Sequence, residues 1–219
     1  MAKPKGKVKI VWSPDFAYGI GLITTDGNLS PDGRHISFTS KDAELIQHYQ
    51  EALGIRVHIG QKARHKEKLK KYFVIQFSDI LFYRFLQSIG LMANKSTRLK
   101  EVSVPEKYFF HFLRGCFDGD GSFYSYWDPR WKSSFMYYTV FYSASRPFID
   151  WLRRIIKQLL GIKGHITSTG RTASKMSCLK YAKKESVLLL KHMYPNPHVR
   201  SLKRKHLKII KALSILVRP

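Results

Sequence analysis

Acidic side chains are scarce in this chain of 219 residues, which has 15 Asp and Glu against 39 Lys and Arg and a formal net charge of +24. Such an excess points to a polyanionic partner, with nucleic acid as the first candidate and an anionic membrane surface as the second. Both halves share the excess, because residues 1–104 hold 17 basic and 9 acidic side chains and residues 105–219 hold 22 and 6. The charge by itself predicts affinity for a polyanion and does not indicate which sequence is recognised or which reaction, if any, is catalysed.

Cysteine and long apolar runs are also scarce. Cys116 and Cys178 are too few for a disulfide framework, which favours reduced thiols. No run approaches the roughly 18 apolar residues of a membrane span, and the basic start MAKPKGKVKIVW lacks the apolar core of a signal peptide. We therefore expect no membrane partner and no secretion, with the cytoplasm of a prokaryotic host or an organelle matrix as the location. The nine histidines show no zinc-ligand spacing.

Hydrophobic residues make up 44% of the chain and aromatic residues 14%, which excludes a disordered basic tail.

The chain contains an internal repeat. FAYGIGLITTDGNL (16–29) aligns with FHFLRGCFDGDGSF (110–123), and the offset of 94 places Gly21 on Gly115 and Asp26 on Asp120. Each segment precedes a strand-like stretch and then an amphipathic helix. The sequence predicts an α+β fold with an α-β-β-α-β-β-α unit repeated twice.

The expected domains are residues 1–91 and 105–219, joined by a linker at 92–104. Local signals predict the motif helices: Ser13-Pro14-Asp15 is a helix start, and Ser103-Val104-Pro105-Glu106 has capping-box spacing. Gly27 and Gly121 should end these helices in a left-handed conformation, as should Gly54 and Gly161 at later helices. The further elements expected are helices at 42–55, 79–91, 146–162 and 184–194, strand pairs at 56–77 and 163–181, and a basic tail that is helical from Leu202.

Two aspartates stand where helices usually place cations. Asp26 and Asp120 each fall at a helix C-terminus, whose partial negative charge disfavours a carboxylate by some tenths of a kcal/mol. Small residues recur at close-packing spacing in both helices, and they are Ala17, Gly21, Thr25, Gly115 and Gly119. If the two helices packed side by side, both carboxylates would lie at one end. Two such carboxylates predict a divalent metal site.

At these residues the sequence resembles a known family. GIGLITTDG (19–27) and LRGCFDGDG (113–121) are similar to the two motifs of a single-chain LAGLIDADG homing endonuclease. The first motif departs from the family pattern at Thr24 and Thr25, which are not the metal-binding positions. The aspartate before the final glycine is present in both motifs.

The resemblance implies two four-stranded antiparallel sheets that form a DNA-binding saddle, with a pseudo-twofold axis through the motif helices. It implies an intron-encoded monomer that needs no protein partner and makes double-strand breaks with short 3′ overhangs at a long site in double-stranded DNA. Asp26 and Asp120 would bind Mg²⁺ or another divalent cation such as Mn²⁺, while Ca²⁺ would bind without supporting cleavage. Lys95 and Lys203 match the family's catalytic basic positions, and Arg204 and Lys205 compete with Lys203.

Base readout is expected from polar side chains on the strands and their hairpins, where Arg can pair with guanine and Gln with adenine. For each of these residues, contact with a phosphate is the alternative. The candidates are Arg34, His58, Gln61, Arg64, Tyr126, Lys132, Arg171 and Lys180.

Other functions stay open. The same scaffold could serve an RNA maturase that binds its host intron RNA, or a catalytically silent DNA-binding protein. A nonspecific RNA or ribosome binder would explain the charge but not the paired motifs. An intein is not expected, because the ends of the chain lack the splicing residues.

Overall fold

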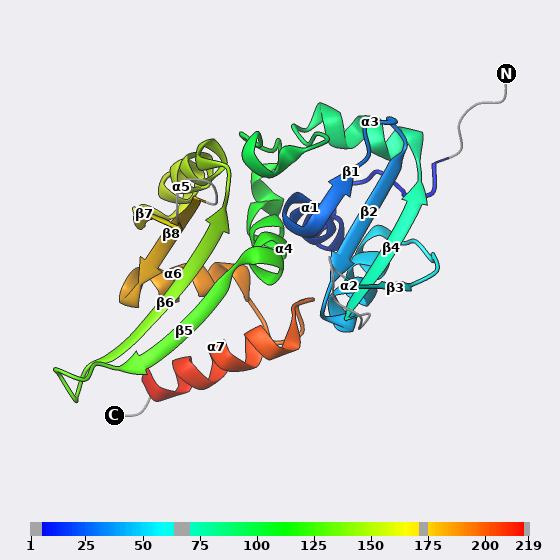
Figure 1. Ribbon diagram of the computed structural model, residues 1–219. Helices are drawn as coiled ribbons and strands as arrows, with labels where there is room; N and C mark the ends of the chain where they lie inside the picture. Colours follow the sequence, from blue (N-terminus) through cyan, green and yellow to red (C-terminus); the bar gives the residue numbers. More distant parts are fainter. Residues whose placement is uncertain (1–5, 64–70, 171–174, 217–219) are drawn as a thin grey trace, which may run out of the picture. The chain divides into compact units, whose positions relative to one another are not determined.

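The computed structural model describes residues 6–63, 71–170 and 175–216. The chain divides into two compact units, shown in Figure 1 with their helices and strands. The first comprises Met1–Lys95 and Val102–Gly119, and the second comprises Ser96–Glu101 and Asp120–Pro219.

The predicted element order occurs twice. The first part contains α1 (Pro14–Asp26), β1 (Gly27–Leu29), β2 (His35–Ser40), α2 (Ala43–Leu53), β3 (Gly60–Lys62), β4 (Tyr72–Ser78) and α3 (Ile80–Ser88). Two 3-10 turns follow, η1 (Lys95–Thr97) and η2 (Glu106–Tyr108). The second part contains α4 (Phe109–Asp120), β5 (Ser122–Trp127), β6 (Phe135–Ser143), α5 (Arg146–Leu160), β7 (His165–Thr169), β8 (Met176–Ala182), α6 (Lys183–Met193) and α7 (Lys203–Leu216).

Each unit holds one four-stranded antiparallel sheet. The strand order is β1-β2-β4-β3 in the first unit and β5-β6-β8-β7 in the second. This shared order confirms the predicted α+β repeat and its two antiparallel sheets. The saddle and the pseudo-twofold axis depend on how the units are placed relative to each other, and they stay predictions.

Alternation along the strands separates a helix-covered face from an open face. In β2, Ile36 and Phe38 are buried while Ser37 between them is partly exposed. The Phe38 ring stacks on Tyr49 of α2 with ring centroids 4.5 Å apart, so α2 covers this face of the sheet. Polar side chains on the opposite face are therefore available to a partner.

The helix-start predictions have different outcomes. The Ser13 side chain accepts a hydrogen bond from the backbone of Phe16 at 3.0 Å, which confirms the cap of α1. The capping box at Ser103 is wrong, because a 3-10 turn comes first and α4 begins only at Phe109. The backbone N–H of Ser103 donates instead to the carbonyl of Ile89, which ties the segment before α4 to the end of α3.

The predictions for the helix ends are confirmed at two glycines and wrong at two others. Gly54 and Gly161 adopt left-handed conformations, with φ of 64° and 70°, as predicted. A left-handed exit at Gly27 and Gly121 is wrong. Gly27 has φ −82° and ψ 159°, because β1 begins directly after α1, and Gly121 is not among the glycines with positive φ. A Cβ on Gly27 would lie 2.2 Å from Cγ1 of Ile23, so lack of space explains the glycine there.

The second motif helix belongs to the first compact unit as far as Gly119. The predicted boundaries at 91 and 105 follow the sequence repeat rather than compactness, and they stay a prediction. No helix in the described ranges has the length and apolar character needed to cross a bilayer. Cys116 and Cys178 are both buried and form no disulfide.

Candidate active site

Small residues let α1 and α4 approach closely within the first unit. A Cβ on Gly21 would lie 2.1 Å from the carbonyl oxygen of Phe112, and one on Gly115 would lie 2.2 Å from the carbonyl oxygen of Tyr18. A Cβ on Gly119 would lie 2.0 Å from Oγ1 of Thr25. A larger residue at Gly21 or Gly115 would therefore have to move backbone, whereas one at Gly119 would have to displace the side chains of Thr25 and Asp26. The predicted close packing of the small-residue faces is therefore confirmed up to Gly119.

A buried polar cluster lies beside this contact. The hydroxyl of Tyr18 donates to Oδ2 of Asp118 at 2.8 Å, and Asp118 is only 1% exposed. Arg114 is equally buried, and its guanidinium lies 5.5 Å from the centre of the Tyr18 ring. Its Nη2 atom lies 3.1 Å from Nδ1 of His111, whose pKa is lowered by burial first and by Arg114 second. The sequence argument missed this cluster, although Asp118 stands in the motif itself.

Asp26 is the last residue of α1 and is partly exposed. Its Oδ2 atom lies 2.8 Å from the place that a Cβ on Gly119 would take, so only glycine leaves room for the carboxylate there. Lys95 is 6% exposed, and its Nζ donates to the carbonyl of Thr25 at 3.0 Å. A buried ammonium at this helix end offsets the partial negative charge next to Asp26.

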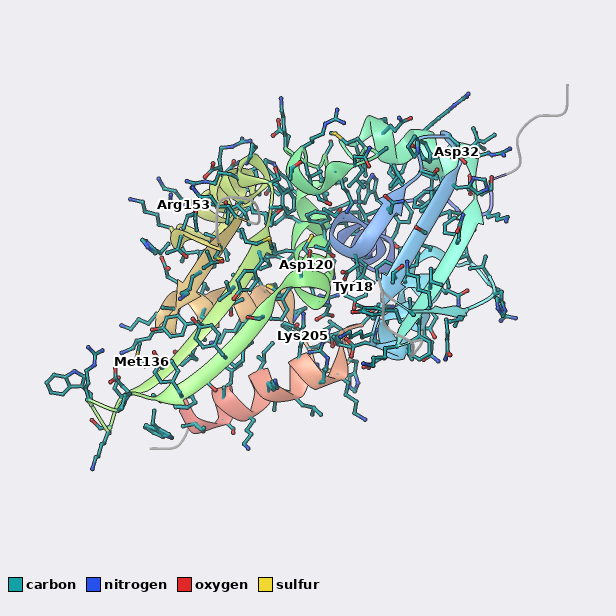
Figure 2. All side chains as sticks on the ribbon, viewed as in Figure 1. Tyr18, Asp32, Asp120, Met136, Arg153 and Lys205 are labelled. Carbon is teal, nitrogen blue, oxygen red and sulfur yellow. The ribbon has the colours of Figure 1, made fainter. Side chains whose placement is uncertain are left out.

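The second unit repeats this arrangement with a different lysine from the one expected. Asp120 ends α4 and is exposed, and Lys205 is 7% exposed with its Nζ donating to the carbonyl of Gly121 at 2.6 Å. Figure 2 labels both Asp120 and Lys205. Lys203 and Arg204 are exposed. Lys205, rather than Lys203, is therefore the buried lysine next to Asp120, although its accepting carbonyl follows the aspartate, whereas the carbonyl that accepts from Lys95 precedes Asp26.

The start of α7 is held by its own contacts. The ring of His206 stacks on Tyr194 with centroids 4.7 Å apart, and its Nδ1 lies 3.1 Å from Oγ of Ser201. The backbone N–H groups of Lys205 and His206 both donate to the carbonyl of Leu202 at 3.0 Å. These contacts fix the turn that carries the buried lysine.

A pocket of about 520 Å³ opens beside Asp26 within the first unit. Asp118 and Gly119 line it from α4, Lys62 and Tyr72 line it from the sheet, and Lys41 and Asp42 line it from the turn between β2 and α2. The pocket therefore combines two lysines with three carboxylates, those of Asp26, Asp42 and Asp118. Sequence reasoning did not single out Lys41 or Tyr72, whose spacing in the chain gives no signal.

Two of the predicted DNA contacts lie together on the second sheet. Tyr126 lies 6.3 Å from Tyr138 between ring centroids, and Tyr138 lies 5.0 Å from Tyr124. Nζ of Lys180 lies 5.1 Å from the centre of the Tyr138 ring and 5.7 Å from that of Tyr124. A hydrogen bond with Tyr124 is the main factor that raises the pKa of Lys180. Lys132 is exposed in the turn between β5 and β6.

The predicted contacts of the first unit are more scattered. Arg34 precedes β2 and lies 3.9 Å from Asp32, with a largely exposed side chain. His58 is exposed before β3. Gln61 pairs with Phe73 of β4, so it lies on the same face of the sheet as this apolar residue and not on the open face. Arg64 and Arg171 lie outside the described residues.

Register also identifies open-face residues of the first sheet that the sequence argument did not single out. They lie on the same face of the sheet as Ser37 and Thr39, which flank the buried Phe38 in β2. These open-face residues are Asn28, His35, Ser37, Thr39, Lys62, Tyr72, Val74, Gln76 and Ser78.

Within the described ranges, no group of three or more His, Cys, Asp or Glu side chains is arranged to hold a metal ion. Asp26 and Asp120 fit a divalent cation by chemistry, because carboxylate oxygens are the hard ligands that Mg²⁺ and Mn²⁺ prefer. Mg²⁺ keeps several waters and is commonly held by one or two carboxylates plus substrate phosphates. Either carboxylate, taken by itself, could therefore contribute to such a site when a phosphate is present.

Comparison with known proteins identifies the fold. The family described as "LAGLIDADG-like domain" matches residues 13–90, which contain α1 and its aspartate. The homing endonuclease I-WcaI, bound to its DNA recognition sequence, has a TM-score of 0.61 at 14% identity over 92% of this chain and 88% of its own. I-DmoI in complex with DNA and Ca has a TM-score of 0.54 at 15% identity over 90% of this chain and 97% of its own.

The same fold also occurs in the N-terminal LAGLIDADG domain of DUF199/WhiA. Its TM-score is 0.53 at 17% identity over 92% of this chain and 88% of its own. A search of curated proteins finds no match. At these identities the solved structures establish the fold.

Proposed function

We propose that the chain is a site-specific DNA endonuclease, because residues 13–90 match the family described as a LAGLIDADG-like domain and the chain has the LAGLIDADG endonuclease fold. It makes metal-dependent breaks in both strands of a long double-stranded target and leaves short 3′ overhangs. Asp26 and Asp120 hold the divalent cations, with Mg²⁺ as the physiological metal. One chain supplies both motifs and acts as a monomer.

One observation carries this proposal. Each motif aspartate has a buried lysine beside it that donates to a neighbouring backbone carbonyl, Lys95 to Thr25 and Lys205 to Gly121. Lysine is almost never this buried unless it is paired or used. The fold repeats the arrangement in two units whose lysines come from unrelated elements, a 3-10 turn and a terminal helix. A duplicated carboxylate with a duplicated lysine suits the cutting of two strands.

The reaction is hydrolysis of a phosphodiester. A water adds its oxygen to phosphorus, and the bond from phosphorus to the 3′ oxygen breaks with its electron pair on that oxygen, which takes up a proton. In this proposal, Lys95 and Lys205 orient the water or stabilise charge on the phosphate. Bound divalent cations supply Lewis-acid polarisation of the phosphate and lower the pKa of bound water. The open faces of the two sheets contact the DNA on either side of the cut.

Cutting of a randomised target library by the purified chain tests the proposal. Products that appear with Mg²⁺ and disappear with a chelator, together with an enriched sequence near the cut, are the expected result. DNA binding that persists in Ca²⁺ without products would agree with the metal requirement. If no sequence is cut with Mg²⁺ or Mn²⁺, the endonuclease proposal fails.

A catalytically silent DNA-binding protein is the second candidate, and the WhiA domain match is the observation that favours it. In that case, the library experiment returns enriched bound sequences without products. Both motif aspartates are present here, which favours the nuclease.

A further inference from the structure

The hairpin of β5 and β6 exposes large aromatic side chains at its tip. Trp131 is 69% exposed, Trp127 is 53% exposed and Tyr126 is 43% exposed. Figure 1 shows this hairpin running out beyond β7 and β8 of its sheet. Exposed aromatic side chains gathered in one place usually mark a binding surface.

The corresponding hairpin of the first unit lacks these features. β1 and β2 have 3 and 6 residues, whereas β5 and β6 have 6 and 9. No large exposed hydrophobic side chain lies in Gly27–Ser40. Because the same sheet forms without the extension, the fold does not require the aromatic tip.

The tip has a defined structure. Asp128 is 6% exposed and accepts from the backbone N–H of Arg130 at 2.9 Å and from its guanidinium at 3.3 Å. The backbone of Asp128 donates to Ser134, and the backbone of Ser134 donates to Trp131 at 2.7 Å. The exposed indole is therefore carried on a hydrogen-bonded turn, so less conformational freedom is lost when it binds.

The surroundings of the aromatic residues are basic. Arg130 has a side chain that is 81% exposed, and Lys132 is also exposed. A groove of about 430 Å³ between β5 and α7 is lined by Tyr126 and Trp127 together with Lys208 and Lys211 of α7. Asp128, the single acid of the hairpin, is already paired with Arg130.

We propose that this hairpin tip binds unpaired nucleotides of a single-stranded nucleic acid. The indole of Trp131 stacks on a base, and Arg130 and Lys132 contact the adjacent phosphates. The aromatic face needs a free base face, whereas duplex bases are stacked on both sides, and the cations match the phosphate charge. The tip residues are not among the proposed catalytic residues, although Tyr126 and Lys132 are also candidates for contact with the duplex target. Single-stranded DNA and RNA share the chemistry that it reads.

Fluorescence anisotropy of labelled 12-nucleotide single strands, one DNA and one RNA, tests the proposal with the full chain and no cutting step. Trp131→Ala should weaken binding roughly 5- to 150-fold, the usual effect of removing one stacked aromatic ring. Trp131→Phe should keep most of the affinity because a flat ring remains. Leu81→Ala is the matched control, since Leu81 is an exposed apolar residue of the first unit and should bind as the unaltered chain does.

The proposal predicts that one or both single strands quench the tryptophan fluorescence more than a closed duplex hairpin of unrelated sequence, and that Trp131→Ala removes most of this quenching. Equal affinity of Trp131→Ala and the unaltered chain for both strands would overturn it. Quenching by anionic lipid vesicles but by neither strand would assign the tip to a membrane surface and overturn it as well. Because no arm measures cleavage, the result is independent of the endonuclease proposal.

Discussion

Substitution of Gly115 by Ala tests the close contact of the two motif helices. The added Cβ would lie 2.2 Å from the carbonyl oxygen of Tyr18 and 3.0 Å from the backbone nitrogen of Leu22. Both atoms belong to backbone and cannot rotate away. To restore an ordinary contact the helices must separate by about 1 Å, and a densely packed interior absorbs such a shift poorly.

The expected loss of stability follows from two opposing effects. Alanine is a better helix former than glycine by about 1 kcal/mol, which favours the variant. Overpacking costs about 1–3 kcal/mol and occasionally more, and contact with the backbone of α1 places this site at the high end. We expect a net loss of about 2 kcal/mol in the free energy of unfolding. At roughly 2–4 °C per kcal/mol for a protein of this size, Tm should fall by about 4–8 °C.

Thermal and urea unfolding followed by circular dichroism measure this loss. Gly60→Ala is the matched control, because its Cβ would meet Cγ1 of Val74 at an ordinary 3.5 Å. It should change stability by less than about 1 kcal/mol. A Gly115→Ala variant as stable as the Gly60→Ala variant would refute the helix contact described here.

Three further predictions concern the same region. Tyr18→Phe removes the hydroxyl that donates to the buried carboxylate of Asp118, and it should cost about 1–3 kcal/mol in urea unfolding; a neutral result would mean that this carboxylate does not need the hydroxyl. Lys205→Met should abolish cutting of one strand, so that nicked DNA accumulates on gels, whereas Lys203→Met should cut normally; the reverse outcome would restore Lys203 to the catalytic position. Burial and Arg114 lower the pKa of His111 below 6.5, so the folded state binds this proton more weakly than the unfolded chain does. The free energy of unfolding therefore falls as the pH drops below 6.5, because the unfolded chain takes up this proton more readily. His111→Asn should reduce the drop in Tm between pH 7 and pH 5, and an unchanged drop would contradict the assignment.

The sequence repeat was enough to predict the element order. Strands and helices are indicated by short-range patterns of apolar and polar residues. The offset of 94 between the motifs then predicts that the second half repeats the elements of the first half. The small residues at Gly21 and Gly115 predicted a close helix contact because only close packing explains their spacing. The left-handed exit at Gly27 was wrong because a strand follows the helix directly, which a rule based on isolated helix ends does not anticipate.

The site was less predictable than the fold. Lys205 and Lys203 are two residues apart in a basic segment, and the choice between them depends on which face of α7 turns inward. That face is decided by the stacking of His206 on Tyr194 and by burial of Leu202, which are tertiary contacts. The bond between Tyr18 and Asp118 joins residues 100 positions apart, so no local pattern could indicate it.

Cleavage of a selected target by Asp26→Asn and Asp120→Asn, each compared with the unaltered chain in Mg²⁺, tests the central claim most directly. Asparagine keeps the size of the side chain but removes the charge that holds a divalent cation. Each single substitution should abolish double-strand cutting while DNA binding is largely preserved. Undiminished double-strand cutting by either variant would contradict the assignment of the two aspartates as the metal-binding pair.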